Sequence, residues 1–251
     1  MDREDFNSAA ADFPDPFRLL VRKSVESTND EVRILAESGA ADGLIVLAER
    51  QTAGRGRRGA AWFSPAGESL AFSVLLRPEE RKALWPRLAL AAGVAVAEAI
   101  ETFGIQAGIK WPNDVWIGNR KVAGILVEAG SDFAVLGIGI NVNSIHFPDE
   151  VSKIATSLRL ESGREFLRAE VLSEMIRRLS RRRQQIGDSD FEFLISAVSQ
   201  RCVLTGNRVT LLTAGGPREG IVEGIAAGGE LLLRTSAGLE RLIQADEIRL
   251  V

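Results

Sequence analysis

Apolar positions follow two different spacings along the chain, and the two alternate over roughly the first two hundred residues. Short apolar or alternating runs are typical of strands, whereas apolar residues that recur every three to four positions are typical of amphipathic helices. The short runs predict strands at 18–22, 44–48, 69–76, 109–111, 115–117, 121–128 and 133–142. The longer spacing predicts a helix that opens at 27–31 and stops at Gly39, followed by helices over 85–103, 165–187 and 190–199.

Neighbouring strands are expected to pair antiparallel, because the turns between successive strands are too tight for a crossover helix. The dipeptide Gly118-Asn119 between two of these strands is typical of a two-residue hairpin turn. These patterns predict an α+β fold with a mixed, largely antiparallel sheet flanked by helices. The composition changes near Arg201, and the short strands beyond it, separated by Gly-rich turns, predict a small all-β barrel.

We therefore expect three parts: a flexible N-terminal arm at 1–17, a main domain at 18–200 and a small C-terminal domain at 201–251. The arm is expected to be mobile or loosely docked, because Pro14 and Pro16 lie there among small and acidic residues. The barrel is marginal in size, so it is expected to dock on the main domain.

Composition narrows the cellular context and the class of partner. The chain has 251 residues, 45% of them hydrophobic, and no apolar run of membrane-spanning length. Its N-terminus is acidic and lacks the layout of a signal peptide. The single cysteine, Cys202, excludes an internal disulfide framework and a cysteine-built metal site. We expect a soluble cytoplasmic protein, and the net charge of −3 argues against a general attraction to nucleic acid or membranes.

A loop rich in glycine and arginine, residues 54–59, follows a predicted strand. Its letters match the dinucleotide fingerprint G-x-G-x-x-G, but that fingerprint requires a helix directly after it, and here another strand follows. The forked guanidinium groups of Arg55, Arg57 and Arg58 suit phosphate or carboxylate, and glycine lets the backbone approach a ligand. The plain alternative is a solvated surface loop. We favour an anion-binding loop that is mobile until a ligand neutralises it.

A second group of polar residues lies in and after the turn at 110–114. Asn113 and Asp114 are hard oxygen ligands that suit Mg²⁺ or a ribose, although Pro-Asn-Asp is also ordinary turn chemistry. Lys121 favours a site, because a lysine at the mouth of an apolar strand can direct its charge at a carboxylate or phosphate. Gly124, inside that strand, permits the close approach of a ligand ring.

The start of the first long helix combines a structural and a chemical signal. Residues 28–31 match the capping box S/T-x-x-E, so Thr28 is predicted to begin the helix. Ser27 is then free to offer its hydroxyl elsewhere, and a helix start is a rigid place from which to present it.

Four motifs follow one another along the chain. They are Glu26-Ser27-Thr28-Asn29, then Gln51 to Gly59 with Trp62-Phe63-Ser64, then Lys110 to Asp114 with Lys121 to Leu126, and finally Gly137 to Asn143. In this order and with these gaps, the chain resembles the biotin–protein ligase family, whose members are also called holocarboxylase synthetases. The resemblance runs from about Val21 to the C-terminus, and it implies a class II synthetase-like catalytic domain followed by an SH3-like domain.

The resemblance implies an enzyme that uses ATP to activate biotin as biotinyl-5′-AMP and transfers the biotin to a lysine of a biotin carboxyl carrier protein. It implies that biotin contacts Ser27, Thr28, Asn29, Gln51, Gly54, Arg55, Gly56, Arg57, Lys121 and Gly124. It implies that ATP or the adenylate contacts Arg57, Arg58, Trp62, Asn113, Asp114 and Asn141, with Mg²⁺ held through ATP at Asp114 and Asn113. The catalytic groups that it implies are Lys121, Arg55, Arg57 and Asp114.

The chain also departs from fuller members of that family. Only 26 residues precede Ser27, too few for the DNA-binding domain of the bifunctional members, so no DNA partner is expected. Ala60 and Ala61 stand where some members carry further basic residues, which implies fewer phosphate contacts. The sequence leaves open whether the chain is a monomer or a homodimer.

Two other functions compete with this interpretation. A lipoate–protein ligase shares the adenylation chemistry, but the paired polar contacts of Ser27, Thr28 and Gln51 suit the ureido ring of biotin, whereas the dithiolane ring of lipoate offers no matching donors. A non-catalytic nucleic-acid-binding protein is the alternative from a different class. The acidic net charge argues against it.

Overall fold

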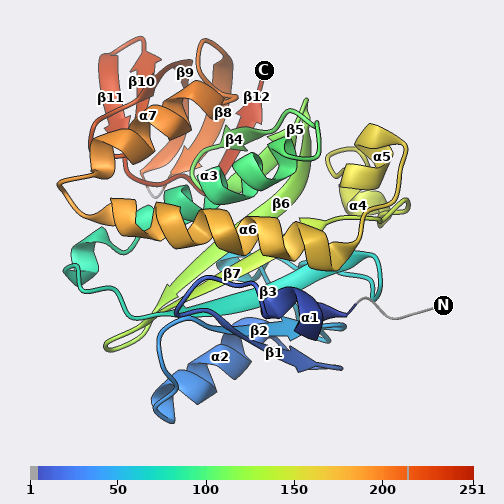
Figure 1. Ribbon diagram of the computed structural model, residues 1–251. Helices are drawn as coiled ribbons and strands as arrows, with labels where there is room; N and C mark the ends of the chain where they lie inside the picture. Colours follow the sequence, from blue (N-terminus) through green and yellow to red (C-terminus); the bar gives the residue numbers. More distant parts are fainter. Residues whose placement is uncertain (1–4, 214) are drawn as a thin grey trace.

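The computed structural model describes residues 5–213 and 215–251, which form one large sheet covered by helices and a smaller sheet near the C-terminus (Figure 1). The large sheet has the order β1-β2-β3-β7-β6-β5-β4. Its strands are β1 (Arg18–Arg22), β2 (Leu44–Ala48), β3 (Ser69–Leu76), β4 (Gly108–Lys110), β5 (Asp114–Ile117), β6 (Arg120–Ala129) and β7 (Ala134–Asn141). β1 and β2 pair parallel, and the remaining neighbours in this sheet pair antiparallel.

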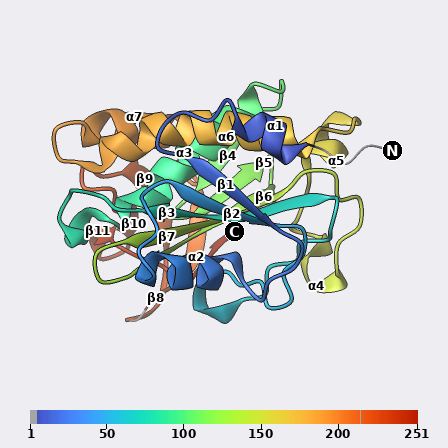
Figure 2. The ribbon, with the colours of Figure 1, turned by 60° about the horizontal axis from the view of Figure 1, so that its bottom comes forward.

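Helices cover both faces of the large sheet. They are α1 (Phe6–Ala10), α2 (Thr28–Glu37), α3 (Arg87–Glu101), α4 (Asp149–Ser152), α5 (Leu158–Ser162), α6 (Arg168–Arg182) and α7 (Phe191–Arg201), with 3₁₀ turns at Arg57–Gly59, Lys82–Leu84 and Arg183–Ile186. α3 and α6 lie over one face, whereas α2 lies against the other (Figure 2). Of the helices described here, none is both long and apolar enough to cross a lipid bilayer.

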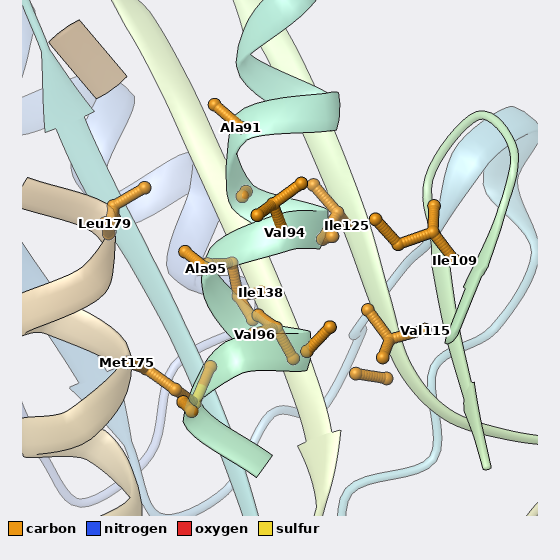
Figure 3. Packing of buried hydrophobic residues seen from close by; sticks show 14 of the residues in the cluster. Ala91, Val94, Ala95, Val96, Ile109, Val115, Ile125, Ile138, Met175 and Leu179 are labelled. Atoms are coloured by element: carbon orange, nitrogen blue, oxygen red, sulfur yellow. The ribbon is translucent and has the colours of Figure 1, made fainter. Parts of the chain in front are cut away.

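Side-chain alternation in the strands explains the two separate layers. In β2, Ile45 and Leu47 belong to the main core on the α3 side, whereas Val46 points the other way and packs with Val32 of α2. The main core is centred on α3, whose Ala95 is buried (Figure 3). Figure 3 shows α3 between the sheet and α6. This packing holds β6 and β7 in place.

The smaller sheet has the order β11-β10-β9-β8-β12 and is antiparallel. Its strands are β8 (Arg208–Thr213), β9 (Gly216–Ile225), β10 (Leu231–Thr235), β11 (Gly238–Leu242) and β12 (Glu247–Leu250). It docks on the main sheet, because the indole Nε1 of Trp111 donates to the carbonyl of Gly229 at 2.9 Å and Cys202 bridges to Ile109. The predicted fold class, α+β with a small C-terminal β-domain, is confirmed.

Strands were predicted more closely than helices. β1, β2 and β3 have the predicted bounds, and the hairpin turn at Gly118-Asn119 joins β5 to β6. The helices α1, α4 and α5 were not predicted, because four or five residues are too few to show a helical period. The strand β12 was also missed. Helix α3 begins at Arg87, two residues later than predicted, after Pro86.

The N-terminal arm is docked more closely than its composition indicates. Residues 1–4 of the predicted arm lie outside the described residues. In the remainder, Phe6, Phe13 and Phe17 are buried and join the main core. These three rings supply the apolar contact that the prolines and acidic residues of the segment do not reveal.

Candidate active site

The large sheet is hollowed on the α2 side, near the start of that helix. On this side β3, β6 and β7 present Ser73, Gly124, Gly137 and Gly139, whereas their neighbours in sequence are apolar residues of the main core. Because side chains alternate along a strand, small residues open a pocket on one face while the other face stays filled. The alternation of small and large residues along these three adjacent strands therefore forms the pocket.

The pocket collects residues from separate motifs. Of the predicted site residues, it is lined by Ser27, Thr28, Asn29, Gln51, Arg55, Gly56, Arg57, Trp62, Asn113, Asp114, Lys121 and Gly124. Gly54, Arg58 and Asn141 are not among the residues that line it. Asn141 is buried and donates from Nδ2 to the carbonyl of Thr156 at 2.9 Å, so in this structure it supports a loop.

One end of the pocket is built from neutral hydrogen-bonding groups. The predicted capping box at 28–31 does not form: Ser27 rather than Thr28 is the N-cap of α2, and the side chain of Ser27 makes no capping bond. The backbone N–H and the hydroxyl of Thr28 both donate to Oε1 of Gln51, at 2.8 and 3.1 Å. Ser27 and Thr28 are each 4% exposed, so a ligand at this end meets fixed neutral groups with little water.

The Gly–Arg loop, residues 54–62, forms a narrow hairpin over the pocket. The N–H of Trp62 donates to the carbonyl of Gly54 at 2.9 Å, and the N–H of Gly56 donates to the carbonyl of Ala60 at 2.7 Å. Arg58 at the tip takes the left-handed backbone conformation, with φ of 57°. Through its hydrogen bond with Trp62, Gly54 closes the base of the hairpin.

Two of the three loop arginines are neutralised by carboxylates of the chain itself. Both terminal nitrogens of Arg55 donate to Asp30 at 2.5 Å, and Glu128 lies 3.5 Å away. Arg58 forms an ion pair with Asp246, in the loop before β12. The hydrogen bonds from Arg55 lower the pKa of Asp30, and those to Asp30 raise the pKa of Arg55, so both groups stay charged. This corrects the expectation that nothing offsets the loop's charge before a ligand binds.

Arg57 is the loop arginine that remains available to an anion. Its NH1 donates to Oδ1 of Asn113 at 3.0 Å, and among the described residues it has no carboxylate partner within ion-pair distance. Burial lowers the pKa of Arg57, and the neighbouring charge of Arg58 lowers it further. An anionic ligand group would relieve both effects.

Lys121 and Trp62 lie against each other in the pocket. The Nζ atom of Lys121 is 2.7 Å from Oδ1 of Asp114 and 5.6 Å from the centre of the Trp62 ring. A β-carbon added at Gly139 would lie 2.2 Å from the Trp62 ring, so only glycine fits there. The Nε1 of Trp62 is buried without a hydrogen-bond partner among the described residues. A ligand acceptor at this point would satisfy it.

A further cation lies close to this cluster. Burial lowers the pKa of Lys110, with Asp114 acting in the opposite direction, and its Nζ lies 4.2 Å from the centre of the Trp116 ring. Arg57, Lys110 and Lys121 thus all lie near Asp114, which is a local excess of positive charge suited to phosphate.

An apolar groove adjoins the pocket. The two hollows share Arg57, Asn113, Ile125 and Leu126 as a common wall, and the groove continues between the main domain and the C-terminal sheet past Ile243. Ile243 is 83% exposed. A molecule seated in the groove would lie next to whatever the pocket holds.

The donor set near the predicted metal position is sparse. Among the described residues, no cluster of three or more His, Cys, Asp or Glu side chains is placed to hold a metal ion. Oδ1 of Asn113 already accepts from Arg57, and Asp114 is paired with Lys121. This set fits a Mg²⁺ ion that brings most of its ligands with it as phosphate oxygens and water, and it does not fit a protein-built cage.

Four residues of the site were missed in the sequence. Asp30, Glu128 and Asp246 pair with the loop arginines, and Ser73 lies behind the pocket wall, where its hydroxyl bonds to Thr28. Carboxylates that act on residues far along the chain have no local signature. Ser73 had one, because it is a serine in the middle of the apolar run 70–76.

Comparisons with known proteins agree with this geometry. Residues 21–143 match the biotin/lipoate A/B protein ligase family, and residues 205–248 match the biotin protein ligase C-terminal domain. A bifunctional ligase/repressor BirA of Bacillus spizizenii is 36% identical over 236 residues, which are 91% of this chain and 73% of that protein. A biotin–[acetyl-CoA-carboxylase] ligase of Mycobacterium tuberculosis is 36% identical over 223 residues, 86% of this chain and 83% of the relative.

The fold comparison extends to a structure with ligands. The biotin protein ligase of Aquifex aeolicus in complex with biotin and ATP superposes with a TM-score of 0.85 at 34% identity. The superposition covers 93% of this chain and 99% of the Aquifex chain. The matched relatives and structures do not favour the lipoate alternative.

Proposed function

Because this chain belongs to the biotin–protein ligase family, we propose that its pocket joins biotin to AMP from ATP and then passes the biotin to a lysine of a carboxylase carrier protein. The observation that carries the proposal is the polarity of the pocket. Neutral hydrogen-bonding groups line one end, and Arg57 and Lys121 lie near Asp114 at the other, with Lys110 close by. Biotin has the same polarity, with a neutral ureido ring at one end and a carboxylate at the other.

The neutral end holds the ureido ring in this proposal. Without a ligand, Oε1 of Gln51 accepts two hydrogen bonds from Thr28, so a ligand can use the Nε2 donors of the amide or replace the Thr28 hydroxyl at Oε1. Ser27 adds a hydroxyl that is not used in capping. A buried site of paired donors and acceptors discriminates strongly against a ring without them, because its own polar groups would then lose their partners.

In the first step the biotin carboxylate attacks the α-phosphorus of ATP. The new bond joins a carboxylate oxygen to phosphorus, and pyrophosphate leaves with its electron pair. The two reactants repel each other as anions, so the residues must chiefly neutralise and align them. We assign this role to Lys121 and Arg57, with Arg55 and Asp114 holding the surrounding charges in place.

The Gly–Arg loop protects the mixed anhydride from water. The hairpin crosses the pocket mouth, and Trp62 packs against Gly124 and Gly139 at its floor. We propose that this indole lies beside the adenine of the adenylate, with Asn113 and Asn141 on the nucleotide side. A closed lid excludes the solvent that would hydrolyse an activated acyl group.

In the second step the carrier lysine attacks the acyl carbon of the adenylate, forming an amide and releasing AMP. The groove beside the pocket is the route that we assign to the carrier segment, because the two share a wall. The attacking amine must lose a proton, and Asp114 is the carboxylate at this place that can accept it.

Mg²⁺ enters the proposal as a companion of ATP. When bound, it would neutralise phosphate charge, and Asp114 and Asn113 are the residues that would contact it. A cytoplasmic location follows from the same proposal, since the reaction consumes ATP.

The proposal is tested by incubating the full chain with biotin, ATP-Mg and a biotin carrier domain and measuring the intact mass of the carrier. We expect a gain of one biotinyl group on one lysine, together with biotin-dependent exchange of pyrophosphate into ATP. A carrier of unchanged mass with no exchange would refute the proposed function. Lipoate in place of biotin is the matched control and should give no adduct.

A further inference from the structure

A continuous chain of side-chain hydrogen bonds runs from the neutral end of the pocket to the Gly–Arg loop. It begins with Gln51 and Thr28, passes through Ser73 and Asn29, and continues to Glu128. Ser73 is fully buried, at 0% exposure, and does not itself line the pocket. None of the predicted roles accounts for Ser73 or Glu128.

Ser73 is the branch point of this chain. Its Oγ lies 2.7 Å from Oγ1 of Thr28 and 2.6 Å from Oδ1 of Asn29. A serine hydroxyl has one hydrogen, so it can donate fully to one of these two atoms and not to both. The Ser73 hydroxyl can therefore donate to Thr28 or to Asn29, and a change in the hydrogen bonds of either neighbour decides between them.

At its other end, this series of hydrogen bonds reaches the Gly–Arg loop through Glu128. Nδ2 of Asn29 donates to Oε2 of Glu128 at 2.7 Å, and Oε1 of Glu128 lies 3.5 Å from Arg55. The amide of Asn29 fills the space that the missing side chain of Gly137 leaves, and Asn29 is 4% exposed. Its Oδ1 and Nδ2 are bonded to Ser73 and Glu128, so a change at Ser73 bears directly on the group that holds the carboxylate.

We infer that Ser73, Asn29 and Glu128 are positioning residues that transmit occupancy of the ring end of the pocket to Arg55 of the loop. The inference rests on the proposed function for the identity of the ring. A ureido N–H that takes Oε1 of Gln51 frees the hydroxyl of Thr28 to donate to Ser73. Ser73 then donates to Asn29, and the fully bonded amide holds Glu128 against Arg55.

The consequence is that the loop tightens when the ring end fills, before any phosphate is present. The ring end of the pocket and the Gly–Arg loop are then energetically coupled, and such coupling requires a group between them that can adopt two hydrogen-bonding arrangements. The hydroxyl of Ser73 supplies these arrangements, because its single hydrogen has two acceptors.

The test measures backbone hydrogen exchange of residues 54–62 in the full chain, with and without saturating biotin and without ATP. In the unmodified protein we expect biotin to slow exchange in this loop by about 5-fold or more, which is the lower range of couplings between sites. Ser73→Ala should bind biotin and lose most of this protection. Glu128→Gln keeps the shape of the side chain without its charge, and it should lose the protection as well.

Ser69→Ala is the matched control. Ser69 lies on the same strand, is 3% exposed and has its hydroxyl 3.1 Å from that of Ser144, outside the chain of bonds. The inference is supported if Ser69→Ala keeps the biotin-induced protection and Ser73→Ala loses it. It is overturned if both variants keep it, if both lose it, or if biotin protects the loop of the unmodified protein no better than buffer. Pyrophosphate exchange on the unmodified protein, measured alongside, reports on the proposed function separately.

Discussion

At the scale of single residues, the site separates charges that are already paired from charges that are available. Arg55 and Arg58 have carboxylate partners, whereas Arg57 is bonded to the neutral amide of Asn113. Lys121 is shared between Asp114 and the pocket. Of the two groups assigned to the reacting anions, Arg57 thus has no carboxylate partner among the described residues, whereas Lys121 has Asp114.

Lys121→Ala should impair adenylation far more than transfer. Removing a charge that acts on the two reacting anions costs about 10²- to 10³-fold in rate, by analogy with the loss of one transition-state hydrogen-bond donor. Transfer from preformed biotinyl-5′-AMP should fall much less, because no phosphate attack is involved. Pyrophosphate exchange and single-turnover transfer measure the two steps separately. Lys153→Ala, at an exposed lysine, is the control, and equal slowing of both steps by Lys121→Ala would remove the assigned role.

The Asp30–Arg55 pair should make the stability of the Gly–Arg loop depend on pH in the acid range. Arg55 lowers the pKa of Asp30 below its ordinary 3.8, so the pair's contribution is complete above that value and is lost as the pH falls below it. Asp30 is 43% exposed, so we expect only about 0.2–1 kcal/mol from the pair. The protection of the loop, measured relative to the intrinsic exchange rate at each pH, should fall over this acid range, and Asp30→Asn should flatten the fall. An unchanged profile in Asp30→Asn would show that another group controls the loop.

At the scale of elements, alternation along three strands builds the pocket, and β7 contributes most directly. Its Ile138 enters the main core while Gly137 and Gly139 open the opposite face to Asn29 and Trp62. The glycines here do not serve a turn. They make room for side chains that arrive from other elements.

Gly139→Ala should therefore weaken the lid with little effect on the core. Its β-carbon would lie 2.2 Å from the Trp62 ring, so the indole must move away. We expect faster release of biotinyl-5′-AMP and a change in tryptophan fluorescence. Gly187→Ala is the control, because the nearest atom to its added carbon is a glutamate oxygen at an ordinary 3.5 Å. Release at the original rate in Gly139→Ala would show that Trp62 does not seal the site.

The elements also show which features a sequence can predict. The bounds of β1 to β3 follow from short apolar runs, and most residues of the pocket follow from motifs whose members lie close together in the chain. The partners of the loop arginines do not, because Glu128 and Asp246 meet them only after the sheet and the C-terminal domain have formed. The N-terminal arm was judged on its prolines, although Phe6 and its companions anchor it.

At the scale of the whole molecule, the C-terminal domain reaches the site through one ion pair. Asp246 lines the pocket and binds Arg58 at the tip of the hairpin, and Trp111 ties the same domain to the main sheet. The small domain is thus part of the mouth of the pocket.

Asp246→Asn should loosen the hairpin without unfolding either domain. The loss of the pair is worth about 1 kcal/mol, which corresponds to roughly fivefold faster escape of the adenylate. Rapid dilution of preloaded enzyme, followed by quantification of free adenylate, measures this rate. Glu219→Gln removes an exposed pair with Arg208 in the same domain and should leave the rate unchanged. Equal effects of the two substitutions would deny Asp246 a particular role.

The pairing of the loop arginines with carboxylates of the same chain also affects how strongly the protein attracts polyanions in the cell. Because two of its three guanidiniums are already paired, the hairpin itself adds little to the long-range field at the mouth of the site, and it gives nucleic acids and inorganic polyphosphates little cause to gather there. Encounter with ATP should accordingly depend only weakly on ionic strength, in contrast to proteins that draw phosphates in by a basic surface. Selection then happens at close range, after the nucleotide has arrived.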